Sequence, residues 1–280
     1  MSRQTATGEA TPTLRMLGHM ARGYSRIFTE SSWADRLSPA SQVCRSGFDA
    51  RLEVVGVQTV AADVMVITLC RPDRSPLPSW TPGAHIDVFT PTGRQRHYSL
   101  IGSPFDRLRY RIAVRKIPHG VGSAELHQLQ VGEHLQVRGP RNAFNLASAD
   151  EYLFLAGGIG ITPILPMVQA VSARTNRWRL IYTGSSRDAM PFADELVAID
   201  DDRVDIRPDD RHGVPDIEGL LAGISSRTAL YVCGPIAMID RARQVADQRA
   251  PASEVHSERF GAPPVINARS FAVNLARSGI

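Results

Sequence analysis

The chain is poor in cysteine and carries almost no excess of charge. Only three cysteines occur among 280 residues, Cys44, Cys70 and Cys233, and they lie far apart. This spacing fits neither a disulfide framework nor a zinc site, and it indicates a reducing compartment. The 32 lysines and arginines barely outnumber the 28 aspartates and glutamates, and no basic tract is interleaved with aromatic residues. We therefore expect no nucleic-acid partner.

Signals for export, membrane insertion and metal binding are missing as well. The N-terminus lacks the apolar core of a secretory signal, and Glu9, Glu30 and Asp35 argue against a transit peptide. Residues 153–171 are uncharged and long enough to span a membrane, but glycines and prolines interrupt them. The eight histidines show no metal-ligand spacing, and no G-x-S-x-G motif is present. We expect a cytoplasmic chain without a metal site or membrane association.

The chain is organised around a glycine turn. Residues 153–156 form a short apolar run typical of a buried parallel strand, and Gly157-Gly158-Ile159-Gly160 ends it. We predict that Thr162 caps a following helix and that Pro163 takes its first position. A strand, a glycine turn and a helix start together bring backbone amides close to a pyrophosphate. A turn that serves only packing is the alternative.

Residues 150–260 alternate strand and helix patterns, which predicts an α/β domain with a parallel sheet. After the strand at 179–182, an ordinary dinucleotide-binding fold would have an acidic residue, but Ser185 and Arg187 stand there instead. The glycines also lack the G-x-G-x-x-G spacing. These departures argue against an ordinary dehydrogenase. The aspartates at 200–202 and at 209–210 have the pattern of solvated loops. Further strands are expected at 204–206, 229–233 and near 255, with helices near 192–199, 217–221 and 236–248.

Residues 50–146 have the rhythm of an antiparallel barrel, because short alternating strands are separated by proline and glycine. The expected strands are 52–60, 64–70, 85–90, 97–101, 108–114 and 134–138. In one of them Arg96, Tyr98 and Leu100 share a face opposite His97 and Ser99. An anion-binding guanidinium beside a flat aromatic suits a planar heterocycle with a phosphate tail. An ordinary half-exposed strand is the alternative.

Two further segments are candidates for ligand contacts. In Gly120-Val121-Gly122-Ser123, Ser123 is predicted as a helix N-cap and Gly122 permits close backbone approach, which suits phosphate; a plain capped loop is the alternative. In Cys233-Gly234-Pro235 a thiol ends a strand and opens a helix, where it could be activated. A cysteine that only fills the end of the strand is the alternative there.

Six segments in series resemble the ferredoxin-reductase-like flavoproteins, in particular the phthalate dioxygenase reductase and vanillate demethylase reductase family. The resemblance covers roughly residues 50–280. It lies in Arg96-x-Tyr98-Ser99-Leu100, Gly120-x-Gly122-Ser123, Gly139-Pro140-Arg141-Asn142-x-Phe144, Gly157-Gly158-Ile159-Gly160-Ile161-Thr162-Pro163, Cys233-Gly234-Pro235 and His256-Ser257-Glu258-Arg259-Phe260.

The resemblance implies an all-β antiparallel (Greek-key) flavin-binding barrel over 50–146 and an α/β parallel-sheet pyridine-nucleotide domain over 150–260. It implies catalytic roles for Ser99, Thr162, Cys233 and Glu258, with Ser99 near flavin N5 and Cys233 beside the nicotinamide. The implied cofactor-binding residues are Arg96, His97, Tyr98, Ser99, Leu100, Gly120, Val121, Gly122, Ser123, Gly157, Gly158, Gly160, Thr162, Ser185, Arg187, Cys233, Gly234, Pro235 and Phe260.

The resemblance also implies cofactors and partners. FMN is preferred and FAD is the alternative; NADH is preferred and NADPH is the alternative, because Arg187 could meet a 2′-phosphate. In this family a plant-type [2Fe–2S] domain usually follows. Residues 261–280 resemble a linker and the first strand of such a domain, but its four-cysteine set is absent, so a cluster is expected in trans or in a missing C-terminal domain.

The N-terminal extension, residues 1–49, is predicted to contain an amphipathic helix over 13–29. Leu17, Met20, Tyr24 and Ile27 fall on one face of that helix. It could lie on the protein's own surface or dock on a partner or a membrane surface.

Three functional hypotheses follow. The first is a flavin reductase that takes hydride from NADH and passes single electrons to a [2Fe–2S] protein serving an oxygenase or demethylase. The second is a flavin NAD(P)H oxidase or quinone reductase. The third is a non-enzymatic nucleotide-binding module.

Overall fold

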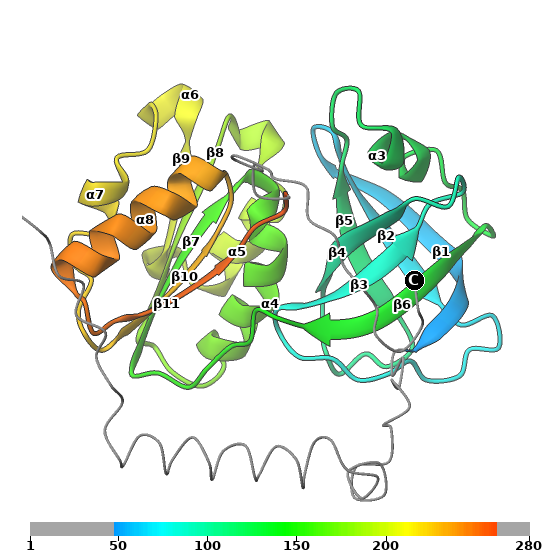
Figure 1. The fold of residues 1–280 in the computed structure, drawn as a ribbon, viewed down its shortest axis with the longest axis horizontal. Coiled ribbons are helices and arrows are strands. Elements are labelled where there is room, and N and C mark those ends of the chain that lie inside the picture. The colour runs from blue at the N-terminus through cyan, green and yellow to red at the C-terminus, as the bar shows by residue number, and fades with distance from the viewer. Residues whose placement is uncertain (1–47, 262–280) are drawn as a thin grey trace, which may run out of the picture. The chain divides into compact units, whose positions relative to one another are not determined.

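The structure is a computed structural model that describes residues 48–261 (Figure 1). The helix predicted over 13–29 and the final strand predicted after residue 261 lie outside the described residues. Among residues 48–261, no helix combines the length and the apolar character that crossing a membrane requires.

The first half of the described chain is a closed six-stranded barrel. Its strands are β1 (Asp49–Ala61), β2 (Val64–Cys70), β3 (Ala84–Phe89), β4 (Gln95–Ile101), β5 (Tyr110–Arg115) and β6 (His134–Asn142), and a short helix α3 (Val121–Leu126) lies between β5 and β6. The order around the barrel is β1-β2-β5-β4-β3-β6, and every pair described is antiparallel. The predicted antiparallel barrel is confirmed.

Alternation along the strands builds the barrel core. Leu52, Ile86, Leu100, Ile112 and Val137 are all fully buried in it, each from a different strand. Residues between these positions face outward, as period-two geometry requires. On β4, this sends Leu100 inward, while Ile101 packs outward in a small cluster that Ile159 of the second half also joins.

The second half is a five-stranded parallel sheet in the order β11-β10-β7-β8-β9. Its strands are β7 (Glu151–Gly157), β8 (Trp178–Gly184), β9 (Val204–Pro208), β10 (Thr228–Cys233) and β11 (Glu254–Glu258). The main helices are α4 (Ile161–Ser172), α5 (Ala193–Ile199), α6 (Asp209–His212), α7 (Ile217–Leu220) and α8 (Ile236–Arg249); single 3₁₀ turns are η1 (Gly158–Gly160), η2 (Arg187–Ala189) and η3 (Asp201–Arg203). The predicted α/β domain is confirmed.

Both faces of this sheet are covered, which explains why β7 and β10 are apolar throughout. One face packs on α4 and α5, and the other on α7 and α8. The chain winds outward from β7 in one direction and returns to β10 on its other side, so the sheet order reverses between these two strands. In open α/β sheets, ligands bind at the carboxyl ends of strands at such a point. Gly157 and Cys233 end these two strands.

Two predicted helix caps are wrong. Helix α4 begins at Ile161 because turn η1 continues directly into it, so Gly160 is the N-cap and the Thr162 hydroxyl donates to the Ile159 carbonyl at 3.0 Å. Helix α3 begins at Val121 with Gly120 as its N-cap. The Ser123 hydroxyl lies inside the first turn, where it donates to the Gly120 carbonyl at 3.0 Å and accepts from the Ile117 N–H at 3.1 Å.

Candidate active site

A cavity of about 270 Å³, here called the barrel cavity, lies where the barrel meets α4. It gathers many of the side chains that the sequence singled out, from four separate segments. Its lining residues are Arg96, His97, Tyr98, Ser99, Ala113, Arg115, Ile117, Gly120, Gly122, Ser123, Ile159, Thr162 and Phe260.

Strand β4 supplies two kinds of surface to this cavity. Tyr98 packs against the barrel core, and burial raises the pKa of its phenol to about 12, so the ring is neutral and largely desolvated. Ser99, on the opposite face, is only 6% exposed. The hydroxyl of Ser99 has no hydrogen bond within residues 48–261. An aromatic ring and a polar hydroxyl are thus offered by adjacent residues.

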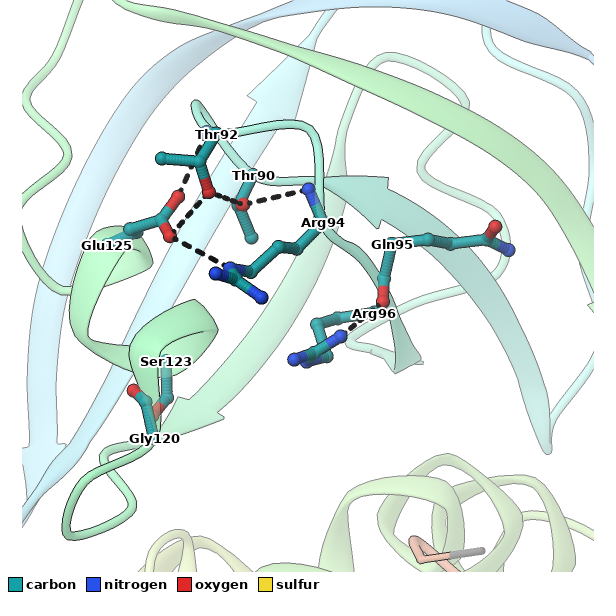
Figure 2. Close-up of polar contacts among 8 residues, drawn as sticks. All are labelled: Thr90, Thr92, Arg94, Gln95, Arg96, Gly120, Ser123 and Glu125. Atoms are coloured by element: carbon teal, nitrogen blue, oxygen red, sulfur yellow. Dashed lines mark hydrogen bonds and ion pairs between the residues drawn. The ribbon is translucent and has the colours of Figure 1, made fainter.

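The guanidinium of Arg96 lies against Gly122. A Cβ atom at Gly122 would come within 3.1 Å of Arg96 Nε, so glycine is what allows the loop to approach the guanidinium. Arg96 Nη1 donates to the Gln95 carbonyl at 2.7 Å (Figure 2). Among the residues described, Arg96 has no carboxylate partner, whereas its neighbour Arg94 is paired with Glu125 at 3.8 Å. Arg96 is therefore a cation available to an anionic ligand.

A second, adjoining cavity of about 450 Å³ shares Arg96, His97, Ser99 and Phe260 with the first. Glu258 and His85 also line it. The Glu258 Oε2 atom is buried without a partner among the described residues. Burial raises the pKa of this carboxyl to about 7, so it can hold a proton near neutral pH.

Two histidines that line this second cavity lie near a buried aspartate. Asp87 is fully buried on β3, where it is paired with Arg141 and with His97 Nε2 at 3.2 Å. His85 lies beside His97, with the ring centroids 5.6 Å apart. Burial, followed by the charges of Arg141 and His97, lowers the pKa of His85. The Oδ1 atom of Asp87 therefore holds His97 in place, while its Oδ2 atom is buried without a partner among the described residues, and His85 favours its neutral form.

A third cavity, of about 500 Å³, lies over the carboxyl ends of the parallel strands and is here called the sheet cavity. The predicted residues Gly157, Gly158, Ser185 and Pro235 line it. Gly158 has a positive φ of 54°, which favours glycine. The remaining lining residues are Arg115, Thr183, Gly184, Ala189, Asp209, Val214, Pro215, Ile217, Ala237, Met238 and Arg241.

Arg115, the last residue of β5, lines both the barrel cavity and the sheet cavity. A Cβ atom at Gly158 would lie 3.7 Å from Arg115 Nη1. Within residues 48–261, Arg115 has neither an ion pair nor a side-chain hydrogen bond. The barrel therefore extends an unpaired cation over the glycine turn of the α/β domain.

Several predicted site residues lie outside the three cavities. Cys233 is fully buried, and burial, with a smaller effect from Glu258, raises the pKa of its thiol, which is the opposite of activation. Gly160 packs against the Cys233 carbonyl, where a Cβ would come within 2.3 Å of the oxygen, and Gly234 packs against Gly157. Gly160 and Gly234 therefore bring the ends of β7 and β10 together and do not line any of the three cavities.

Leu100, Val121 and Arg187 are also placed away from the barrel and sheet cavities. Leu100 belongs to the barrel core, and Val121 lines a separate surface hollow beside α3. The guanidinium of Arg187 is paired with Asp194. The expected contact of Arg187 with a 2′-phosphate therefore finds no support in the structure.

Sequence reasoning missed Arg115 and Asp209. Asp209 was expected in a solvated loop, but it lines the sheet cavity, and its Oδ1 atom is buried without a partner among the described residues. Burial, together with the nearby Asp210, raises the pKa of Asp209. Its position directly after β9, at the carboxyl edge of the sheet, is the signal that could have identified it.

Comparisons with known proteins agree with this geometry. Residues 51–146 match the family model described as an oxidoreductase FAD-binding domain. The chain is 35% identical over 240 residues to phthalate dioxygenase reductase of Burkholderia cepacia, covering 82% of this chain and 74% of the relative. The chain belongs to the phthalate dioxygenase reductase family. It is a flavin-dependent oxidoreductase.

Solved structures place this reductase in the same fold. One is described as phthalate dioxygenase reductase, a modular structure for electron transfer from pyridine nucleotides to [2Fe–2S]; it has a TM-score of 0.70 and 33% identity, over 79% of this chain and 70% of that one. Another is an intact type IV self-sufficient cytochrome P450 monooxygenase, with a TM-score of 0.73 and 36% identity. The reductase matches it over 77% of its own length and spans 28% of that longer chain.

Proposed function

We propose that this reductase takes hydride from NADH onto bound FMN and passes single electrons to a [2Fe–2S] centre that serves an oxygenase or demethylase. The observation that carries the proposal is that the barrel cavity and the sheet cavity are adjacent, because Arg115 lines both. Two ring systems must come close for hydride transfer, and a shared wall brings their sites together.

The residues of the barrel cavity fit a flavin. Arg96, Gly122 and Ser123 would hold its phosphate, because Arg96 is unpaired among the described residues and the first-turn amides of a helix have no intrahelical partner. Tyr98 and Phe260 offer apolar and aromatic surface to a planar ring, and the Ser99 hydroxyl is available for a hydrogen bond. When bound, a flavin supplies the ability to accept a hydride and to release electrons singly.

The flavin is proposed to be FMN because the chain resembles a family that uses it, and FAD is the alternative. Releasing the flavin by heat and separating FMN from FAD by chromatography distinguishes the two.

NADH is proposed over NADPH because of the charges around the sheet cavity. Asp209 offers a carboxylate that can accept hydrogen bonds from ribose hydroxyls and that repels a 2′-phosphate. Arg187, the cation that could have favoured NADPH, does not line the sheet cavity, and its Nη2 atom is paired with Asp194. Arg115, which is unpaired among the described residues, would meet the dinucleotide phosphates.

The electron acceptor is proposed from the relatives. Relatives of this chain are named as reductase components, among them phthalate dioxygenase reductase and carnitine monooxygenase reductase subunit. The sequence contains three cysteines, whereas a plant-type [2Fe–2S] cluster needs four as ligands. The cluster would therefore belong to a separate protein or a further domain.

The test is spectroscopic. The purified protein should be yellow and should be bleached by anaerobic NADH, and it should reduce an added [2Fe–2S] protein faster than it forms peroxide. Faster peroxide or quinone turnover would favour an oxidase. A protein that binds NADH but neither FMN nor FAD would refute the proposal in favour of a nucleotide-binding module.

A further inference from the structure

The carboxylate of Glu125 lies outside the barrel cavity. It joins the two segments that contribute Arg96 and the Gly122-Ser123 loop to that cavity. Glu125 lies on α3, and Thr92 and Arg94 lie in the turn between β3 and β4. Glu125 Oε1 accepts from the Thr92 hydroxyl at 2.7 Å, and Oε2 accepts from the Thr92 N–H at 3.1 Å. Arg94 Nε lies 3.8 Å from Oε1 (Figure 2). We call this set the Glu125 clamp.

The turn held by the clamp is itself well defined. The Thr90 N–H donates to the Arg94 carbonyl at 2.9 Å, and the Gly93 N–H donates to the Thr90 carbonyl at 2.7 Å. Because these backbone bonds make the turn one unit, a tether on Thr92 fixes the start of β4 as well. Arg96 lies two residues past Arg94 on that strand.

The helix contacts this hairpin at two points. Gly122 and Glu125 are three residues apart on α3, so they lie on the same side of the helix. Glu125 binds the turn, and Gly122 lies against the Arg96 guanidinium, where a Cβ would come within 3.1 Å of Nε. The clamp therefore sets the spacing between Arg96 and the Gly122-Ser123 loop.

The Glu125 clamp also determines that Arg94, and not Arg96, is paired with a carboxylate. Glu125 does not line the barrel cavity. Hydrogen bonds from Thr92, then from Thr90, keep the pKa of Glu125 below its usual range, so the carboxylate stays charged and retains Arg94. Arg96 then remains the unpaired guanidinium beside the loop among the residues described.

We propose that Glu125 is a positioning residue that, through Thr92 and Arg94, holds Arg96 where a phosphate monoester binds, so that the protein selects FMN over unphosphorylated riboflavin. This rests on the proposed flavin function. The expected consequence is specific: loosening the clamp weakens the contact with the phosphate and leaves the contacts with the isoalloxazine ring unchanged.

The experiment titrates flavin-free protein with FMN and, separately, with riboflavin, following flavin fluorescence. We expect Glu125→Gln and Thr92→Val to raise the Kd for FMN about tenfold, the effect of losing one charge-assisted hydrogen bond, and the Kd for riboflavin less than about twofold. Arg96→Ala serves as the positive control. Glu133→Gln is the matched control, because the Glu133 carboxylate accepts a hydrogen bond only from the nearby Gln130 N–H among the described residues.

Equal losses for FMN and riboflavin, or no loss for either, would overturn the proposal. Should riboflavin bind too weakly to measure, the ³¹P resonance of bound FMN decides, since an unchanged resonance in Glu125→Gln also overturns it. Wild-type protein that binds none of FMN, riboflavin and FAD would instead refute the flavin function itself, whereas binding of FAD alone would overturn only the selection of FMN.

Discussion

Cys233 and Glu258 are direct neighbours, paired across the parallel strands β10 and β11. Both side chains are desolvated, and the charge of Glu258 contributes to the raised pKa of the Cys233 thiol. Each group therefore favours its neutral form, because burial disfavours the charged form of both. The pair can hold a proton near the site without forming a thiolate nucleophile, as expected where a cofactor performs the chemistry.

The first prediction concerns stability and Glu258. Its folded-state pKa of about 7 lies above the ordinary glutamate pKa of 4.5, so the folded state retains a proton that the unfolded chain has already lost. This contribution to stability is fully present below pH 4.5, is lost as pH rises, and is gone above pH 7. The loss amounts to about 3 kcal/mol, at 1.36 kcal/mol per pKa unit.

Glu258→Gln removes this titration. Urea unfolding of flavin-free protein at acid and alkaline pH should show that the variant gains stability relative to wild type as pH rises from 4.5 to 8. A constant difference between the two proteins would contradict the raised pKa. Glu254→Gln, an exposed position on the same strand, is the control.

The second prediction concerns Cys233. Its side chain is fully buried at the end of β10, where the backbone packs against Gly160 of the glycine turn, so truncating it is expected to shift the strand ends that border the sheet cavity. Cys233→Ala should slow reduction of the flavin by NADH about tenfold and change the Kd for NADH much less, because a small misplacement of the reacting ring costs rate more than binding. Stopped-flow absorbance measures both. An unchanged reduction rate would show that the thiol only fills the end of the strand, and Cys233→Ser tests whether volume alone is needed.

Sequence patterns predicted the framework well because period-two alternation and glycine-ended apolar runs are local signals. Strand β4 illustrates this, since Leu100 faces the core and Ser99 the opposite side, as alternation requires. The cap at Thr162 was misplaced because local residue preference cannot show that the preceding turn η1 runs into α4, and the cap at Ser123 because α3 begins two residues earlier, at Val121. In the sequence, nothing distinguishes Arg115 from other residues at the end of a strand. Only barrel closure and the packing of the α/β domain bring it to the glycine turn.

The third prediction concerns Arg115. If its guanidinium meets the dinucleotide phosphates, Arg115→Gln should raise the Kd for NADH about tenfold through loss of a charge-assisted hydrogen bond. Reduction by 1-benzyl-1,4-dihydronicotinamide, a hydride donor without phosphate, should be unchanged. Flavin content should also stay constant, in contrast to Arg96→Ala.

Stopped-flow reduction with both donors makes the comparison for Arg115. Equal slowing with both would indicate that Arg115 supports the fold or the flavin rather than the phosphates. Arg174→Gln is a suitable control, because Arg174 is exposed in the turn after α4 and donates to the carbonyl of Ala170 in that helix.

The fourth prediction concerns the choice of nicotinamide cofactor. Asp209 lines the sheet cavity, with one carboxylate oxygen buried and unpartnered among the described residues, so it can accept a hydrogen bond from a ribose hydroxyl. Asp209→Ser should lower kcat/KM for NADH about tenfold and raise that for NADPH, because it removes both the acceptor and the repulsion of a 2′-phosphate. Asp210→Asn, which changes the adjacent carboxylate outside the cavity, should leave the ratio of the two values near that of wild type.

The pH dependence of cofactor choice gives an independent check on Asp209. Because burial and Asp210 raise the pKa of Asp209, the carboxyl takes up its proton at a higher pH than an exposed aspartate does. The neutral form no longer repels a 2′-phosphate, so the preference for NADH over NADPH should narrow as pH falls toward the acid range. This narrowing should disappear in Asp209→Ser, which has no carboxyl to titrate. Steady-state kcat/KM for both cofactors across pH measures it, and a slope that persists in the variant would assign the effect to another group.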